Sequence, residues 1–248
     1  MAVRVGSARI DENGHATGGK AGDQTGKEVS TQNWYLHAKG WRVFRAKDNK
    51  CAEKIAQDMQ WACDNKHIGY DQNQRGTLYN VSKPYGFNCR DVITNCETDC
   101  SAMVRVCCAY AGIMLPNFTT TSEPSILLNS GAFVELKGSK YTESSNYLRR
   151  GDILVTKTQG HTVVVLTSGK YADTPIPEPD ISDYKSVKVT GGTVNIRTAP
   201  NVENGKIIGV VKKGDTLKFQ GEQSSGGWYL VEYKNQNGWI SGRYSKLI

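Results

Sequence analysis

Apolar residues recur at helical spacing in two stretches of the first 112 residues. In the first, EKIAQDMQWACDNKHIG, Ile55, Met59 and Ala62 share one face and Ala56 lies beside them. This period predicts an amphipathic helix that ends near Gly69.

The second stretch, TDCSAMVRVCCAYAG, predicts a helix that begins at Cys100. Thr98 or Asp99 can act as its N-cap, and Gly112 supplies the stop. The apolar positions that recur along it are Ala102, Met103, Val106, Cys107 and Tyr110.

Three short segments after these helices have the composition of strands. They are FVELKG, GDILVTK and HTVVVLTSG, and the last is rich in β-branched residues and too short for a helix of its own. Helices that precede an antiparallel sheet indicate an α+β domain over residues 1–174. The role of residues 1–48 stays open, although Trp34, Tyr35, Trp41 and Val43 favour packing.

The pattern changes after residue 174. The segment TPIPEPDISDYK places Pro175, Pro177 and Pro179 among acidic residues, which predicts an extended linker over 175–185. Residues 186–248 then run as short β-rich segments between turn signals, which predicts a small all-β barrel.

Composition narrows the class of protein. The chain has 248 residues, 38% of them hydrophobic, and a net charge of +7, which favours approach to anionic polymers. It has no run of five or six basic residues, no zinc-finger spacing and no aromatic RNA-binding signature, so we expect no nucleic-acid role. No apolar stretch is long enough to span a membrane, and the first twenty residues lack the apolar region of a secretory signal, so we expect synthesis in the cytoplasm and no membrane insertion.

The cysteines are odd in number and all lie before residue 109, which excludes a complete disulfide framework. Cys89, Cys96 and Cys100 could be metal ligands, but no CxxC or HExxH spacing occurs, so we expect no metal and no cofactor. Cys107 and Cys108 are interpreted as helix packing residues. His15, His37 and His67 show no ligand spacing with one another and are interpreted as structural or surface residues.

Cys100 and His161 are the strongest candidate catalytic pair. A cysteine in the first turn of a helix meets unpaired backbone N–H groups and the positive end of the helix dipole, which favour the thiolate and can hold an oxyanion. His161 is the only histidine after Cys100 and stands at the start of a predicted strand, where it can serve as the base. A buried structural cysteine and a packed histidine are the alternatives.

The C-terminal segment resembles a bacterial SH3 domain. The resemblance rests on the N-x-R-x-x-P opening at Asn195, Arg197 and Pro200 and on the closing G-W-I at Gly238 to Ile240. It implies attachment to the bacterial cell wall through residues 186–248. Trp228 and Trp239 are interpreted as core aromatics, and the candidate wall contacts are Tyr229, Tyr233 and Tyr244.

The N-terminal segment resembles the papain-like NlpC-type family of cell-wall peptidases and its CHAP-type relatives. The residues that carry this resemblance are Asp99-Cys100-Ser101, the L-R-R-G-D-I-L run that ends at Leu154, and Gly160-His161. The aromatic-Gly-Gly approach common in the family is missing, and the likeness covers mainly residues 70–173. It implies a papain-like fold for residues 1–174.

The same resemblance implies a third catalytic position on a strand after the histidine strand. That position falls on Asp173, which could accept a hydrogen bond from the imidazole and fix its tautomer. Asp173 also begins the acidic linker, and Asp23 in the glycine-rich N-terminal segment is a competitor.

The expected reaction is attack by Cys100 on an amide carbonyl, with His161 taking and returning the proton. Residues before the nucleophile could line the substrate cleft, and a surface loop is the alternative for all of them. The candidate substrate-binding residues are Tyr70, Gln72, Arg75, Tyr79 and Ser101, of which Ser101 could instead cap the helix.

A Cys/His domain followed by a wall-binding domain resembles a bacteriophage endolysin of Gram-positive hosts. The implied partner is Gram-positive peptidoglycan, cut at the lactyl to L-Ala bond or within the stem peptide. The alternatives are a bacterial autolysin, a non-catalytic wall-binding or phage structural protein, and a zinc-dependent amidase. The sequence leaves the choice of bond and the oligomeric state open.

Overall fold

The computed structural model describes residues 2–173, 184–224 and 227–248. The chain divides into two compact units, Met1–Thr174 and Pro175–Ile248. Most of the predicted proline-rich linker, residues 175–183, lies outside the described residues.

A six-stranded sheet forms the centre of the first unit, with strand order β2-β1-β8-β7-β3-β6 and antiparallel pairing throughout. Its strands are β1 Arg4–Ala8, β2 Val29–Asn33, β3 Trp41–Ala46, β6 Phe133–Leu136, β7 Ile153–Thr156 and β8 Thr162–Val165. The three predicted strands are therefore present as β6, β7 and β8. The predicted order of helices first and sheet second is wrong, because β1 to β3 precede the first helix and residues 1–48 supply half of this sheet.

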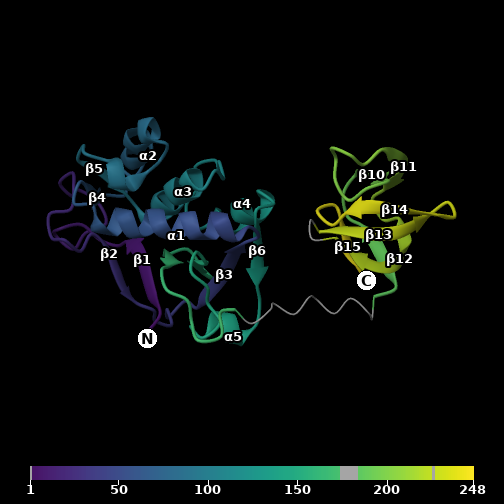
Figure 1. Ribbon diagram of the computed structural model, residues 1–248, viewed down its shortest axis with the longest axis horizontal. Helices are drawn as coiled ribbons and strands as arrows, with labels where there is room; N and C mark the ends of the chain where they lie inside the picture. Colours follow the sequence, from purple (N-terminus) through teal and green to yellow (C-terminus); the bar gives the residue numbers. More distant parts are fainter. Residues whose placement is uncertain (1, 174–183, 225–226) are drawn as a thin grey trace. The chain divides into compact units, whose positions relative to one another are not determined.

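The longest helix, α1 Asn49–Asp64, and α3 Cys100–Tyr110 pack against each other and against the sheet. Figure 1 shows α1, α3 and α4 on one side of the sheet and α5 on the other. The remaining elements of this unit are β4 Ile68–Tyr70, α2 Thr77–Ser82, η1 Lys83–Tyr85, η2 Cys89–Asp91, β5 Cys96–Thr98, α4 Glu123–Asn129 and α5 Ser139–Thr142. The strands β4 and β5 form a separate parallel pair.

The helix α1 is confirmed, but it ends at Asp64 and not near Gly69. Asp48 caps its start by accepting a hydrogen bond from the Lys50 N–H, and the chain leaves the helix in an extended conformation at Asn65. Gly69 instead lies in β4, where a Cβ atom would stand 2.6 Å from the Gly22 carbonyl oxygen. This glycine therefore serves a close approach between two backbone segments, which the helical period could not reveal.

Each face of the sheet has its own core. One face packs against the helices through residues such as Phe44, Ile153 and Val164, together with Met59 and Met103 of α1 and α3. The opposite face holds a smaller cluster around Trp41, Val163 and Leu148. Buried side chains on alternate positions of the central strands thus point to opposite layers.

The second unit is all β, as predicted. Its strands follow the order β11-β10-β14-β13-β12-β9-β15, and a core of mostly β-branched side chains fills it. They are β9 Ser186–Val189, β10 Thr193–Arg197, β11 Ile207–Lys212, β12 Thr216–Gln223, β13 Trp228–Tyr233, β14 Gln236–Ser241 and β15 Ser245–Leu247. Within the described parts of both units, no helix is long and apolar enough to cross a membrane.

Candidate active site

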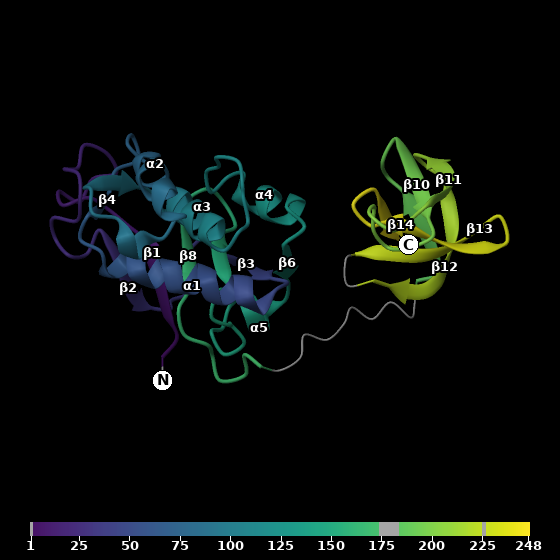
Figure 2. The same ribbon diagram turned by 45° about the horizontal axis from the view of Figure 1, so that its top comes forward.

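Cys100 is the first residue of α3, and Asp99 is the N-cap. The Asp99 carboxylate accepts a hydrogen bond of 2.7 Å from the Ala102 N–H, which satisfies one of the unpaired donors of the first turn. The side chain of Cys100 is buried, with 7% of its surface exposed. Figure 2, turned to bring the top of the molecule forward, shows α3 beside α1 and over the strands of the sheet.

An ion pair holds this cap in place. Arg75 donates to both carboxylate oxygens of Asp99, at 2.5 and 3.2 Å, and also to Ser101 Oγ at 2.8 Å. Ser101 itself is buried and donates to Asp99. The structure therefore places the predicted substrate residues Arg75 and Ser101 in the network that fixes the start of α3.

The Cys100 sulfur lies against the backbone N–H of Thr162, the residue that follows His161. This N–H and that of Ser101 lower the pKa of the thiol. Burial outweighs them, and with the nearby carboxyls of Asp99 and Glu123 it raises the pKa of Cys100 to about 12. The N–H groups at the helix start thus act in the expected direction, and burial outweighs their effect on the pKa of the thiol.

His161 stands at the entry to β8, in a short turn after β7. Its backbone N–H donates to Thr156 Oγ1 at 3.0 Å, and the N–H of Gly160 donates to Thr120 Oγ1 at 3.2 Å. Its Nε2 lies 3.2 Å from Ser7 Oγ. Burial, with a smaller contribution from His37 and Arg9, lowers the pKa of His161 to about 4, so the imidazole is neutral at physiological pH.

Ser7 reaches the histidine because β1 pairs with β8. In this antiparallel pair Val5 lies opposite Val165 and Gly6 opposite Val164. Continued by one residue, this register puts Ser7 opposite Val163, two residues after His161. Gly6 permits the approach of β1 to α1, since a Cβ there would lie 2.8 Å from Met59 Cγ. Ser7 is 2% exposed and was not predicted, because nothing in RVGSA distinguishes it from an ordinary strand serine.

Asp173 is not brought to the histidine. It lines a hollow with Arg149, Arg150 and Ser168, beyond the C-terminal end of β8, whereas His161 precedes the N-terminal end. The four residues of the strand alone span roughly 13 Å. The prediction followed the chain forward from His161, whereas the strand that pairs with β8 on that side is β1, from the start of the chain.

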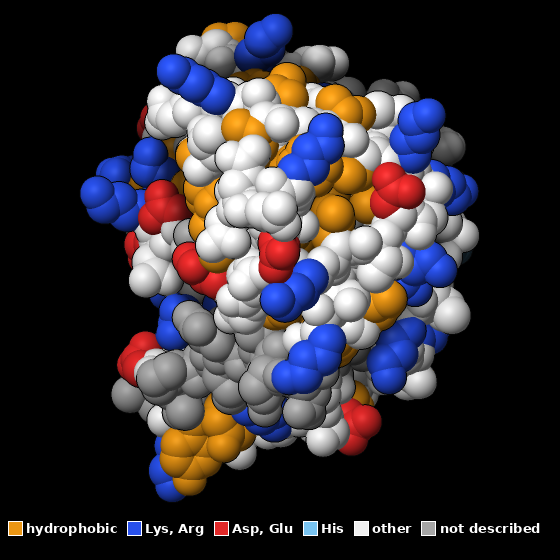
Figure 3. Space-filling model, turned by 90° about the vertical axis from the view of Figure 1, so that its right-hand side faces the viewer, with side chains coloured by type: hydrophobic (Ala, Val, Ile, Leu, Met, Phe, Trp, Pro, Cys, Tyr) orange, Lys and Arg blue, Asp and Glu red, His pale blue; other side chains and the backbone are white. Residues whose placement is uncertain are grey.

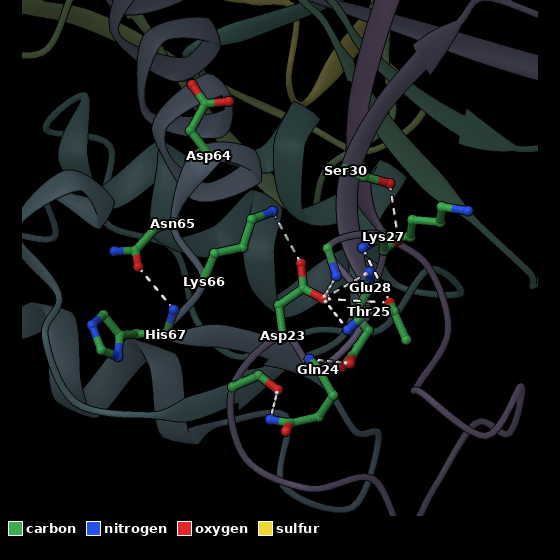
Figure 4. Close-up of polar contacts among 12 residues, drawn as sticks. Asp23, Gln24, Thr25, Lys27, Glu28, Ser30, Asp64, Asn65, Lys66 and His67 are labelled. Atoms are coloured by element: carbon green, nitrogen blue, oxygen red, sulfur yellow. Dashed lines mark hydrogen bonds and ion pairs between the residues drawn. The ribbon is translucent and has the colours of Figure 1, made fainter.

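The competitor Asp23 is engaged elsewhere. Figure 4 shows its carboxylate accepting hydrogen bonds from the backbone of the turn that follows it, including Thr25 N at 3.1 Å and Gly26 N at 2.6 Å. Its other oxygen lies 3.4 Å from Lys66 Nζ. Asp23 therefore closes the 23–28 turn and ties it to the segment after α1.

The remaining predicted substrate residues divide into two groups. Tyr70 lies near Cys100, since a charge on that cysteine raises the pKa of Tyr70. Gln72 donates a hydrogen bond of 3.0 Å to the Tyr70 hydroxyl. Tyr35, from the segment after β2, is affected by Cys100 in the same way and was not predicted. Tyr79 packs against its neighbours. Its ring centroid lies 4.8 Å from that of Phe87, with the rings tilted by 45°, and the Arg105 guanidinium lies 3.7 Å from the Tyr79 ring centroid.

A buried carboxyl, that of Glu123, contacts the residue after His161. Glu123 of α4 accepts a hydrogen bond of 2.9 Å from Thr162 Oγ1, and its Oε2 has no hydrogen-bond partner. Burial raises its pKa well above the ordinary value. The only sequence signal for Glu123 is its place in the first turn of a short Pro-containing helix. No group of three or more His, Cys, Asp or Glu side chains in the described parts of the chain could hold a metal ion.

Family models match both units. The model of the endolysin-like domain matches residues 5–172, which is more than half of the chain, and the model of the bacterial SH3 domain matches residues 192–246. No curated protein matches the chain significantly. Together the two matches support a lytic protein that targets peptidoglycan. The chain therefore belongs to the endolysin-like domain family and carries a bacterial SH3 domain after that domain.

Proposed function

We propose that residues 1–174 form a papain-like cysteine hydrolase that cleaves an amide bond in the stem peptide of Gram-positive peptidoglycan, and that the SH3 domain holds it on the wall. The single observation that carries the proposal is the position of the Cys100 sulfur against the Thr162 N–H, directly beside His161. The sulfur at the helix start thereby lies beside the backbone of the residue that follows His161 at the strand entry.

The resting pair is a thiol and a neutral imidazole, so the nucleophile must be activated during attack. His161 accepts the Cys100 proton as the sulfur adds to the amide carbonyl. The C–N bond then breaks, the imidazolium returns its proton to the amine that leaves, and water hydrolyses the thioester. The unpaired N–H groups at the start of α3 face the oxyanion that forms.

Ser7 takes the role that the third residue has in a triad. Its hydroxyl can accept a hydrogen bond from Nε2–H of His161, which fixes the tautomer and leaves the other ring nitrogen for the cysteine. The hydroxyls of Tyr35 and Tyr70 lie near the sulfur and can contact the substrate peptide.

The decisive experiment compares Cys100→Ala with Cys51→Ala in a turbidity assay on purified walls. Cys51 is a partly exposed cysteine on α1 and serves as the matched control. We expect Cys100→Ala to lose lysis by about a thousandfold or more, as when a nucleophile is removed, and Cys51→Ala to retain it. Undiminished lysis by Cys100→Ala would reject the catalytic assignment.

Inhibitors separate the thiol mechanism from a zinc-dependent amidase. Iodoacetamide should abolish lysis in the Cys51→Ala background and EDTA should leave it intact. The opposite pattern would support the zinc enzyme, and walls that bind the chain without being cut by any variant would support a non-catalytic protein. The masses of the released muropeptides identify the bond, since an amidase and an endopeptidase leave different new termini.

A further inference from the structure

The SH3 domain contains a hollow of about 330 Å³ at one end of its sheet. It lies between β10, the loop after β10, the start of β13, and the turn that follows β14. Its lining residues are Thr193, Val194, Asn195, Arg197, Val202, Trp228, Ser241, Arg243 and Tyr244. The catalytic assignment makes no use of any of them.

The basic residues of this domain are unevenly distributed with respect to the hollow. Residues 186–248 contain seven lysines and two arginines, and Arg197 and Arg243 both line the hollow while no lysine does. Arginine presents a planar fork of donors that matches a carboxylate, whereas lysine offers a point charge. Two arginines at this place therefore suit an anionic group of defined geometry.

The two arginines are held differently. Arg197 is partly buried and donates to the Gly205 carbonyl oxygen at 2.7 Å through one nitrogen, which braces the side chain and leaves other donors of its guanidinium. Arg243 is exposed, and its guanidinium lies 5.6 Å from the ring centroid of Tyr244. One cation is thus fixed in the wall of the hollow and the other stands at its edge.

Aromatic and apolar side chains complete the lining. Trp228 was expected to be a core residue, but it is partly exposed in the hollow, and the buried core of the domain is built from other side chains. Tyr244 and Val202 are 45% and 66% exposed. Such flat apolar surfaces beside arginine forks suit a short peptide that ends in a carboxylate.

We propose that this hollow binds the free carboxylate and the adjoining residues of a peptidoglycan stem peptide. The inference rests on the proposed function, in which the wall peptide is the substrate, and names the chemistry by which the SH3 domain recognises it. Nine basic against four acidic residues in 186–248 attract the anionic wall at longer range. Figure 3 shows Lys and Arg side chains spread over one face of the molecule, with hydrophobic atoms exposed between them.

The test measures sedimentation of the full chain with purified walls, in the cold and in the non-lytic Cys100→Ala background. We expect Arg243→Gln to weaken binding by about tenfold or more, because a charge-assisted contact is lost. Lys234→Gln is the matched control, since Lys234 lies in the β13–β14 turn, does not line the hollow, and carries the same charge. Its binding should change by less than about twofold. Equal binding by both variants would overturn the proposal.

Two treatments of the walls identify the anion. Amidation of the peptide carboxylates should remove the difference in binding between the Arg243→Gln variant and its parent chain, and removal of teichoic acid should leave that difference in place. A difference that disappears with teichoic acid would assign the hollow to a phosphate polymer and refute the peptide proposal. Because the readout is binding, lysis by Cys100→Ala would reject the catalytic assignment of Cys100 without deciding whether the hollow binds the peptide.

Discussion

Ser7 Oγ and His161 Nε2 lie 3.2 Å apart although 154 residues separate them in the chain. The contact exists because β1, the first strand of this sheet along the chain, pairs with β8, the last along the chain. Through this contact the imidazole of His161 is oriented by a neutral hydroxyl and not by a carboxylate.

Replacement of Ser7 by alanine should lower kcat/KM by about fivefold, since one hydrogen bond to the imidazole is worth roughly 1 kcal/mol. The expected loss is mainly in kcat, because Ser7 acts through His161 and does not bind the substrate. Kinetics on soluble peptidoglycan fragments measure it, with Ser30→Ala on the neighbouring strand β2 as the control. A change in KM alone would contradict a positioning role.

Asp173→Asn should alter kcat/KM by less than about twofold, because its carboxylate lies beyond the far end of β8 from the imidazole. The same assay that measures Ser7→Ala tests it. A loss of several hundredfold would show that the segment around Asp173, at the end of the first unit, rearranges to reach His161 during catalysis.

The pH profile should show a wide plateau. Because burial lowers the pKa of His161 to about 4, the imidazole is already the base at pH 5, and the Cys100 pKa of about 12 keeps the thiol protonated well above neutrality. We expect kcat/KM on soluble fragments to be nearly constant from about pH 5 to pH 9 while circular dichroism shows a folded chain. An acid limb with a midpoint near 6.5 would mean that the imidazole is solvated.

Arg75→Gln should destabilise the N-terminal unit, since Asp99, Ser101 and the Phe118 carbonyl would lose a charged donor. Hydrogen bonds to charged groups contribute about 1.5–3 kcal/mol, and we expect a loss of that order in the free energy of unfolding. Urea titration measures it, with exposed Arg90→Gln as the control. Unchanged stability with a raised KM would instead support Arg75 as a substrate-binding residue.

Glu97 should make the first unit less stable as the pH rises. Its side chain in β5 is buried, and burial, with the nearby carboxylates of Glu28, Asp71 and Glu12, raises its pKa to about 8 although the backbone N–H of Gly22 lowers it. In the unfolded chain the group ionises near its ordinary value of 4.5. Between these values the folded state binds more protons, so stability falls from about pH 4.5 to about pH 8.

Glu97→Gln removes that ionisation and should raise the Tm at pH 8 by roughly 3 °C or more, with a smaller effect at pH 4.5. Thermal unfolding at both pH values measures the difference, and exposed Glu143→Gln is the control. An equal shift at both pH values would point to altered packing and not to the proton.

Local patterns predicted the elements that carry the strongest local signals. The helix that starts at Cys100 was predicted because Asp99 is a good N-cap and the apolar period follows at once, and β8 because HTVVVLT is β-branched. The sulfur's neighbour Thr162 and the hydroxyl of Ser7 could not be found in this way. Their roles depend on strand pairing between distant segments, and one sequence carries no record of which strands become neighbours.

The state of the thiol was also beyond the sequence. A cysteine at a helix start is expected to ionise easily, and the N–H groups of Ser101 and Thr162 do lower its pKa. The opposing contribution is larger and comes first from burial, then from the adjacent Asp99 and from Glu123, a residue 23 positions away. Burial is a property of the assembled fold, so the motif alone could not reveal the contribution that raises the pKa.

The pairing of β1 with β8 also sets an order of events during synthesis. A ribosome releases Ser7 early and His161 only when nearly the whole first unit has been made, so a growing chain contains the proposed nucleophile Cys100 before it contains the proposed base His161. Contacts between such distant segments form late in folding and slowly. For the proposed hydrolase, activity would therefore be withheld from the unfinished polypeptide until β8 has been made and has paired with β1.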